Sequence, residues 1–207
     1  MVRAASTLVI CLFFVIGAPN LGAAQRQQVL FEDNFTTLDP GWGLPGEVMR
    51  TEQNRLVLTP EDSQCRTRLY QGDVFEDFDY QVKIRMAKKV GPIALSGVVF
   101  WAKDYDNHYD FVVNQAGQFA ITRHTGKRTL SLQTWTDNPA IKKEEGGTNL
   151  FRVVAKGNQA TLFVNGTQVY ALKGFPPPGG SLIGFIGCSS QGARNVFELS
   201  ELKVVAP

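Results

Sequence analysis

The side chains that can do chemistry in this sequence are scattered carboxylates, two histidines and three cysteines. Acid hydrolysis of a glycosidic bond with retention needs two carboxylates about 5–5.5 Å apart, and a strand presents such a pair when acids recur at every second residue. The acids between Glu76 and Asp79 begin such a run, but Gln81 interrupts it. Glu198 and Glu201 are an odd number of residues apart, so alternation predicts that they face opposite sides of a strand. The sequence therefore predicts no paired-acid site.

The residues with metal-ligand chemistry show no pattern of a known site. His108 and His124, like the cysteines, lack the spacing typical of zinc, and no serine occupies a nucleophile-elbow motif. Residues 104–107 with Asp110 offer enough oxygen ligands for Ca²⁺, although they lack the Gly and the terminal Glu of an EF-hand loop. Asp and Asn also form turns through bonds to their own backbone. Calcium and a simple turn both stay open here, and no cofactor is predicted.

The first residues are typical of an export signal. Arg3 gives a short positive start, residues 8–16 are apolar, and residues 22–24 are small, as in a cleaved signal peptide. The apolar run is shorter than the roughly 20 residues of a membrane-spanning helix. We therefore assign 1–24 to a signal peptide and 25–207 to one mature domain in the periplasm or outside the cell.

The cysteines agree with export. Cys11 leaves with the signal, and Cys65 and Cys188 remain as an even number in an oxidising compartment. We predict that they form a disulfide; two separate buried thiols are the alternative.

The elements that must position these residues are strands. Apolar residues alternate with polar ones, as in Tyr80, Val82 and Ile84, and this period of two is typical of half-buried strands. Asn165-Gly166 is typical of a type I′ hairpin. The predicted strands are 28–35, 55–59, 66–70, 78–88, 97–103, 108–114, 118–124, 129–135, 150–156, 159–164, 168–172, 182–188 and 196–204. Many short strands with tight turns predict an all-β sandwich of two antiparallel sheets.

Alternation also predicts which side chains share a sheet face. Over 97–103 it points Trp101 away from the core and Ala102 into it. The predicted ligand-binding face comprises Trp101, His108, Asp110, His124, Gln133 and Trp135, with Arg68 and Arg85 joining from neighbouring strands. An indole that packs on a sugar ring, beside polar groups that bond its hydroxyls, suits a saccharide. The alternative is that either tryptophan serves packing.

Several segments match one known family in order along nearly the whole mature chain. They are Leu30–Phe35 with Gly41-Trp42, Gly97–Trp101, Asn107–Phe111, Asn149–Gly157, Leu162–Gly166 and Gly184–Gly187. They resemble exported bacterial domains described as family-16-glycosidase-like, also called 3-keto-disaccharide-hydrolase-like. The resemblance implies the concanavalin A-like jelly roll of the lectin/glucanase superfamily, with carbohydrate as the commonest ligand class. The acids of true family-16 enzymes are missing, so we expect no hydrolysis of β-glucans.

These observations predict an exported, non-catalytic module that binds a carbohydrate or another polyhydroxylated ligand. A glycoside or 3-keto-disaccharide hydrolase with unrecognised catalytic residues is one alternative, and a structural or protein-interaction sandwich is another. The net charge of +2 is too small for a nucleic-acid partner. No membrane insertion is expected after signal cleavage, and the oligomeric state is not predicted.

Overall fold

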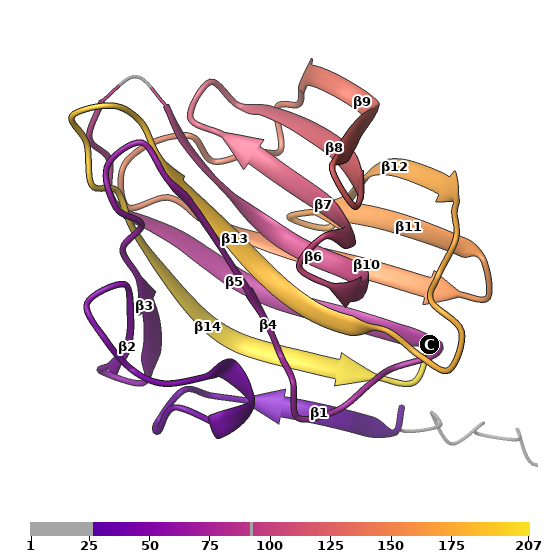
Figure 1. The fold of residues 1–207 in the computed structure, drawn as a ribbon. Coiled ribbons are helices and arrows are strands. Elements are labelled where there is room, and N and C mark those ends of the chain that lie inside the picture. The colour runs from indigo at the N-terminus through magenta and orange to yellow at the C-terminus, as the bar shows by residue number, and fades with distance from the viewer. Residues whose placement is uncertain (1–26, 92) are drawn as a thin grey trace, which may run out of the picture.

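The computed structural model describes residues 27–91 and 93–207, so the predicted signal peptide lies outside the described residues. The described chain forms two antiparallel β-sheets that pack face to face (Figure 1). The predicted all-β sandwich is thus confirmed. Among the described residues, no helix has the length and apolar character needed to span a membrane.

One sheet has eight strands and the other has six. In spatial order the eight-stranded sheet contains β12 (Thr167–Lys173), β11 (Gln159–Val164), β10 (Thr148–Lys156), β5 (Phe78–Lys88), β14 (Val196–Val205), β3 (Arg55–Leu58) and β2 (Met49–Glu52), and β1 (Val29–Asp33) pairs with β14. The six-stranded sheet contains β4 (Cys65–Leu69), β13 (Leu182–Ser189), β6 (Ala94–Asp104), β7 (Asn107–Asn114), β8 (Gln118–Thr125) and β9 (Arg128–Asp137). A short 3-10 turn, η1, covers Pro40–Trp42. Strand β2 is the one that the sequence reading did not predict.

The hairpin between β11 and β12 shows why its turn residues are needed. Asn165 and Gly166 both have positive φ, 50° and 81°, as a type I′ turn requires. The Asn165 side chain also accepts a hydrogen bond from the Leu150 amide (2.8 Å) and donates one to the Ala140 carbonyl (2.7 Å). The turn residue therefore ties the hairpin to the neighbouring strand.

The main core fills the space between the two sheets. Its largest fully buried side chains are aromatic and include Trp42, Tyr80 and Phe185. The Tyr80 hydroxyl donates a hydrogen bond to the Gly184 carbonyl of the facing sheet at 3.0 Å, so the sandwich has a polar tie as well as apolar packing. Burial raises the pKa of this hydroxyl, which stays neutral.

A second apolar cluster lies on the other side of the six-stranded sheet, facing outward. Its members alternate along the strands with core residues, as Val112 does between Phe111 and Val113. The cluster consists of Leu69, Val99, Ala102, Val112, Ala120, Leu182, Ile186 and Cys188. An outer face with an apolar floor is unusual for a solvated sheet, and it marks this face as a candidate binding surface.

A bulge in β6 reverses the predicted orientation of Trp101. Pairing of β6 with β7 is regular up to Phe100 and resumes only at Asp104, and Trp101 has a φ of 47°. The indole is 1% exposed and packs against Phe100 and Tyr109. The outward placement of Trp101 was wrong, as was the inward placement of Ala102, because the bulge shifts the alternation by one residue.

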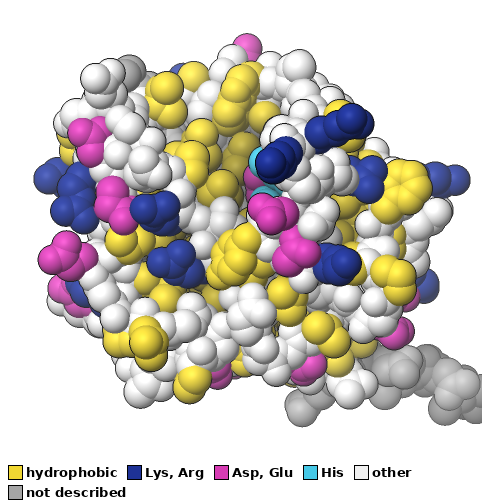
Figure 2. Space-filling model, in the orientation of Figure 1, with side chains coloured by type: hydrophobic (Ala, Val, Ile, Leu, Met, Phe, Trp, Pro, Cys, Tyr) yellow, Lys and Arg dark blue, Asp and Glu magenta, His cyan; other side chains and the backbone are white. Residues whose placement is uncertain are grey.

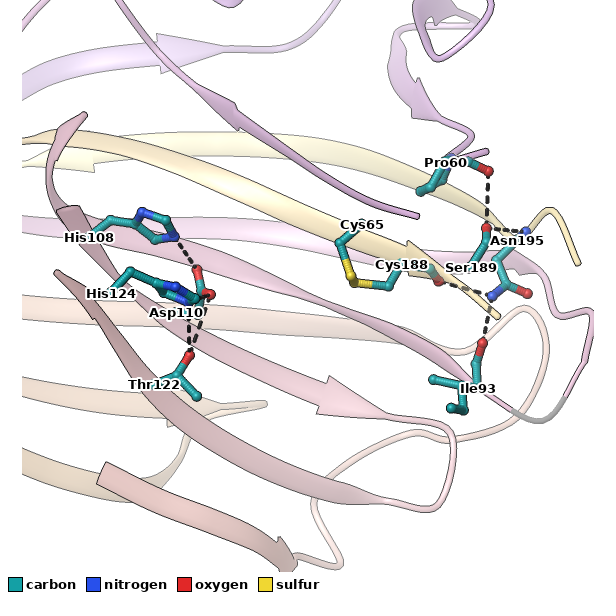
Figure 3. Close-up of a disulfide and its surroundings, with 10 residues drawn as sticks. All are labelled: Pro60, Cys65, Ile93, His108, Asp110, Thr122, His124, Cys188, Ser189 and Asn195. Carbon is teal, nitrogen blue, oxygen red and sulfur yellow. Dashed lines mark hydrogen bonds and ion pairs between the residues drawn. A yellow bond between two sulfur atoms is a disulfide. The ribbon is translucent and has the colours of Figure 1, made fainter. Parts of the chain in front are cut away.

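The predicted disulfide between Cys65 and Cys188 is confirmed. The two residues face each other directly on β4 and β13, which neighbour each other in the sheet although the cysteines are 123 residues apart. Figure 3 shows the bridge on the same sheet as the histidines. It fixes the register of the edge strand β4, which borders the outer face.

Candidate functional site

Two neighbouring strands bring both histidines of the chain together around one carboxylate. His108 of β7 faces His124 of β8 directly across the ladder, and Asp110 faces Thr122. The imidazole rings stack with centroids 4.4 Å apart and an interplanar angle of 18°. Asp110 Oδ2 lies 2.9 Å from His124 Nε2, and Oδ1 lies 3.3 Å from His108 Nε2 (Figure 3). We call these three residues the His–Asp–His cluster.

Threonine hydroxyls surround the cluster. Thr122 Oγ1 donates to Asp110 Oδ2 at 3.4 Å, and Thr129 Oγ1 lies 3.2 Å from His124 Nδ1. The side chains of His108 and Asp110 are only 6% and 7% exposed, whereas that of His124 is 28% exposed. The cluster is therefore a buried polar group with one face open to solvent.

The charges in the cluster stabilise one another. Burial would raise the pKa of Asp110, but its contacts with His108 and His124 outweigh that effect, so the pKa lies below its usual range. The contact with Asp110 raises the pKa of His124 above its ordinary value, against the opposing effect of burial. The carboxylate thus stays ionised, and His124 holds its proton more tightly than a free imidazole. Such an arrangement can accept or deliver a proton at a bound ligand.

Two hollows meet at the cluster. The first, which we call the Trp135 hollow, encloses about 530 Å³ over the outward apolar floor. Trp135 is 44% exposed at its rim, and Tyr105 is 52% exposed. Figure 2 views this face and shows histidine side chains at the edge of a hollow with an apolar floor.

The second, the Phe175 hollow, encloses about 660 Å³ on the other side of the histidines. Phe175 is 71% exposed, and the Arg123 guanidinium lies 4.6 Å from its ring centroid. Trp101 contributes to the lining from below. His108 and His124 line both hollows, so the His–Asp–His cluster stands at their junction.

The structure brings together most of the predicted face. Gln133 and Trp135 line the Trp135 hollow with the His–Asp–His cluster, as alternation predicted. Arg68 does not join them, because Cys65 and Thr67 of the same strand line the hollow and Arg68 alternates with them.

Arg85 lies elsewhere in the sandwich. It belongs to β5 of the eight-stranded sheet and forms an ion pair with Glu198 at 2.9 Å. Arg85 is therefore on the opposite side of the molecule from the two hollows, and its predicted role in the binding face was wrong.

Glu198 and Glu201, two of the acids considered for hydrolysis, also lie on the eight-stranded sheet. Glu198 and Glu201 border the same surface depression, contrary to the prediction of opposite faces, because β14 bulges between Ser200 and Lys203. Both are held in ion pairs: Glu198 with arginines and Glu201 with Lys83. Neither reaches the two hollows.

The predicted calcium residues separate into two groups. Asp104 accepts bonds from the Asp106 amide (2.9 Å) and from Asn107 Nδ2 (2.8 Å), as a turn former does. These hydrogen bonds, that of Asn107 foremost, lower the pKa of Asp104. Asp110 instead turns toward the histidines. Within residues 27–91 and 93–207, the His–Asp–His cluster is the one group of three such side chains that converges.

Sequence reading missed Arg123 and Phe175. Phe175 lies in a connection that strand alternation does not describe, although an aromatic residue before Pro176-Pro177-Pro178 is a signal of a fixed surface ring. The histidine pair was missed as a unit because spacing rules compare residues along the chain. The predicted turn at Gln115–Gly117 could have revealed the pair, because a hairpin centred on Ala116 places His108 opposite His124.

Comparisons with known proteins agree on the family and fold. The sequence profile described as a 3-keto-alpha-glucoside-1,2-lyase-like domain matches residues 27–198. No curated protein matches the chain in sequence. Among solved structures, the β-glucanase of Bacillus licheniformis is 10% identical, with 88% of this chain and 100% of that chain covered and a TM-score of 0.61.

Two other similar structures carry the same fold. The laminarinase of Flavobacterium sp. UMI-01 is 14% identical over 86% of this chain and 100% of that one, with a TM-score of 0.60. The carbohydrate-binding module CBM66 of Bacillus subtilis is 13% identical over 73% of this chain and 86% of that one, with a TM-score of 0.57. These likenesses establish the concanavalin A-like jelly roll.

Proposed function

This chain belongs to the family of 3-keto-alpha-glucoside-1,2-lyase-like domains, and we propose that it binds a saccharide of at least two sugar units across its two hollows. The observation that carries the proposal is that His108 and His124 line both hollows. Each hollow falls within the roughly 300–1,000 Å³ of ordinary small-ligand pockets. A saccharide that fills both would place a linkage between its units over the His–Asp–His cluster.

The chemistry of the two hollows suits sugar rings. Trp135 and Phe175 are exposed aromatic side chains, one in each hollow, and an aromatic face packs well on the apolar face of a pyranose. Gln133 and the histidines supply donors and acceptors for hydroxyl groups. An apolar floor with a few convergent polar groups is the usual composition of a ligand pocket.

The proposal is tested by glycan-array screening, followed by calorimetric titration of any hit. Trp135→Ala and Phe175→Ala should each weaken binding by about 1–3 kcal/mol, as loss of a dominant aromatic contact does. Leu44→Ala is the matched control, because Leu44 is 91% exposed and borders neither hollow. Equal affinity in all three variants, or no saccharide ligand at all, would leave a structural or protein-interaction sandwich as the function.

A second candidate function is elimination from a 3-keto glycoside, favoured by the acid–base groups of the His–Asp–His cluster, whose histidines line both hollows. A base removes the C2 proton next to the ketone, a C1–C2 double bond forms, and the C1–O bond breaks as the leaving oxygen gains a proton. An imidazole beside a carboxylate can serve as the base, and protonated His124 as the acid. The step consumes no oxidant or reductant.

Turnover separates the two candidates. An eliminating enzyme releases free sugar from a 3-keto disaccharide, whereas a binding module leaves it intact. Asp110→Asn should lower the rate of release far more than it weakens saccharide binding, since the imidazoles lose the carboxylate that orients them. Binding by the parent protein without any release would reject elimination and keep the binding function.

We also propose that the mature chain works in the periplasm or outside the cell. The Cys65–Cys188 disulfide supports this, because stable disulfides form in oxidising compartments. N-terminal sequencing of the exported protein should begin at Gln25. A protein that keeps Met1 and remains in the reducing cytosol would contradict export.

A further inference from the structure

Positive charge collects in the Phe175 hollow. Lys103 and Arg123 line it together with the two histidines, and none of the described residues that line it is Asp or Glu. The Trp135 hollow has the opposite character, because Asp110 lines it and, within the described chain, no Lys or Arg does. The two halves of the surface therefore differ in charge, although the protein as a whole carries only +2.

Arg123 is held in place by aromatic rings and not by a carboxylate. Its guanidinium lies 4.6 Å from the ring centroid of Phe175 and 5.5 Å from that of Tyr109, both within the range of a cation–π contact. Within residues 27–91 and 93–207, its side chain forms no ion pair or hydrogen bond. The guanidinium of Arg152, by contrast, is bonded to Asp79. Arg123 therefore keeps its N–H donors for a ligand.

Two further donors in the lining of the Phe175 hollow lack an acceptor. Trp101 lines the hollow, and its Nε1 is buried without a hydrogen-bonding partner in the described parts of the chain. The Tyr109 hydroxyl accepts a hydrogen bond from the Phe175 amide at 3.0 Å, and its own proton has no acceptor among the described residues. Buried donors are nearly always satisfied. The unpaired pair therefore favours a ligand that brings acceptor oxygens.

We infer that the Phe175 hollow binds an anionic group of the saccharide, either a carboxylate or a sulfate ester. Such a group offers acceptor oxygens only, and charge-assisted bonds from a guanidinium or an ammonium group are among the strong hydrogen bonds of proteins. Arg123 supplies the planar fork of donors and Lys103 a second positive charge. His124 adds a third when it is protonated, and its contact with Asp110 raises its pKa.

The acids nearest to these cations lie outside the Phe175 hollow. Asp104 follows Lys103 in the chain, but its carboxylate accepts hydrogen bonds within its own turn and does not line the hollow. Asp110 contacts the histidines and lines the Trp135 hollow alone. An anionic group would thus be attracted to the first hollow and repelled by Asp110 in the second.

This charge distribution orients the ligand. The inference rests on the proposed saccharide function and names its ligand class, an acidic saccharide. Its charged unit occupies the Phe175 hollow and its neutral unit the Trp135 hollow.

The experiment compares each acidic glycan with its uncharged counterpart. An array that pairs uronate and sulfated glycans with their neutral parents identifies hits. Calorimetry then measures the affinity of the acidic hit and of the same glycan after carboxyl reduction or desulfation. Removal of the anionic group should lower the affinity of the parent protein by at least about tenfold, as loss of a hydrogen bond to a charged group does. The treatment that causes this loss identifies the group as a carboxylate or a sulfate.

Substitution of the cations tests which residues bind the group. Arg123→Gln should lower the affinity for the acidic glycan by about 10–100-fold and that for the neutral counterpart by less than about twofold. Lys103→Gln should act in the same direction but more weakly, because Lys103 is exposed. Arg128→Gln is the matched control, since Arg128 is exposed on the neighbouring strand β9 and lines neither hollow. It removes the same charge and should leave both affinities unchanged.

Two results would overturn this inference and leave the proposed function standing. One is equal affinity of the parent protein for the acidic glycan and its neutral counterpart. The other is an equal loss of affinity for both glycans in Arg123→Gln, which would make Arg123 a packing residue for Phe175. Absence of any glycan binding would instead overturn the proposed function, and this inference with it.

Discussion

Replacing Trp101 by alanine should destabilise the fold severely, although the sequence pattern alone had placed this residue on the binding face. A buried Trp removes about 150–250 Å² from water, which at about 25 cal/mol/Å² is about 4–6 kcal/mol. Trp101 is 1% exposed, so this full area applies. Its Nε1 has no hydrogen-bonding partner among the described residues, and an unsatisfied buried donor costs about 1–3 kcal/mol. Subtracting the cost of the unsatisfied Nε1 donor from the gain of burying the indole predicts that Trp101→Ala lowers the free energy of unfolding by about 3 kcal/mol.

A second substitution at the same position isolates the backbone. Trp101 has a φ of 47°, and this left-handed conformation costs a residue with a Cβ about 1–2 kcal/mol. Glycine has no Cβ and adopts positive φ without this cost, so Trp101→Gly should be more stable than Trp101→Ala by about 1 kcal/mol. In an ordinary strand the order is the reverse, since glycine is about 0.5–1 kcal/mol less stable than alanine.

Urea unfolding followed by circular dichroism measures both differences. The same two substitutions at Trp135 serve as controls, because Trp135 is 44% exposed on β9. Trp135→Ala should change the free energy of unfolding by less than about 0.5 kcal/mol. Trp135→Gly should be less stable than Trp135→Ala. If Trp101→Ala costs under 1 kcal/mol, or if Trp101→Gly is the less stable of the two, the buried and bulged position of Trp101 is refuted.

Three further predictions concern other parts of the fold. Replacing both Cys65 and Cys188 by serine should lower the free energy of unfolding by about 5 kcal/mol. The bridge spans 123 residues, and the entropy that it removes from the unfolded chain grows with the logarithm of loop length. A urea midpoint equal to that of the parent would contradict this. Arg152→Met should lower the free energy of unfolding by about 2 kcal/mol, because it leaves the carboxylate of Asp79, which is 1% exposed, without its ion-pair partner at 2.7 Å. This is less than the roughly 3–5 kcal/mol for breaking a fully buried ion pair, since the Arg152 side chain is 39% exposed. Thermal unfolding identical to that of the parent would count against it. The third concerns pH: the pKa of Asp110 is lowered and that of His124 is raised, so their interaction stabilises the fold fully between the ordinary values of about 3.9 and 6.5. That stabilisation fades as pH falls through the lower pKa of Asp110 or rises through the higher pKa of His124, and an excess stability of the parent over His124→Gln that stays constant from pH 5 to 9 would refute the coupling.

Alternation predicted the faces of β7 and β8 correctly near the site because the ladder between them is regular there. It also held for Gln133 and Trp135 of β9, although the β8–β9 ladder shifts its register around Ile121. His108, Asp110 and His124 face outward as predicted, and so do Gln133 and Trp135. The disulfide was predictable for a different reason, since removal of the signal leaves two thiols.

The failures occur where a strand bulges. Trp101 and Glu201 are non-glycine residues with positive φ, 47° and 50°, and neither carries a sequence signature of a bulge. At each of these bulges the alternation shifts by one residue, so the following side chains point to the face opposite to the one predicted. Arg85 was misplaced for another reason: the order of strands in a sandwich does not follow the order in the chain.

The most direct test of the proposed binding surface is acrylamide quenching of tryptophan fluorescence during saccharide titration. Of the three tryptophans, Trp42 and Trp101 are 2% and 1% exposed while Trp135 is 44% exposed, so collisional quenching reports chiefly on the Trp135 hollow. A saccharide bound across the two hollows should protect the parent protein from acrylamide, and Trp135→Phe should retain binding while losing most of the protection. Binding that leaves the quenching of Trp135 unchanged would place the ligand elsewhere and contradict binding across the two hollows.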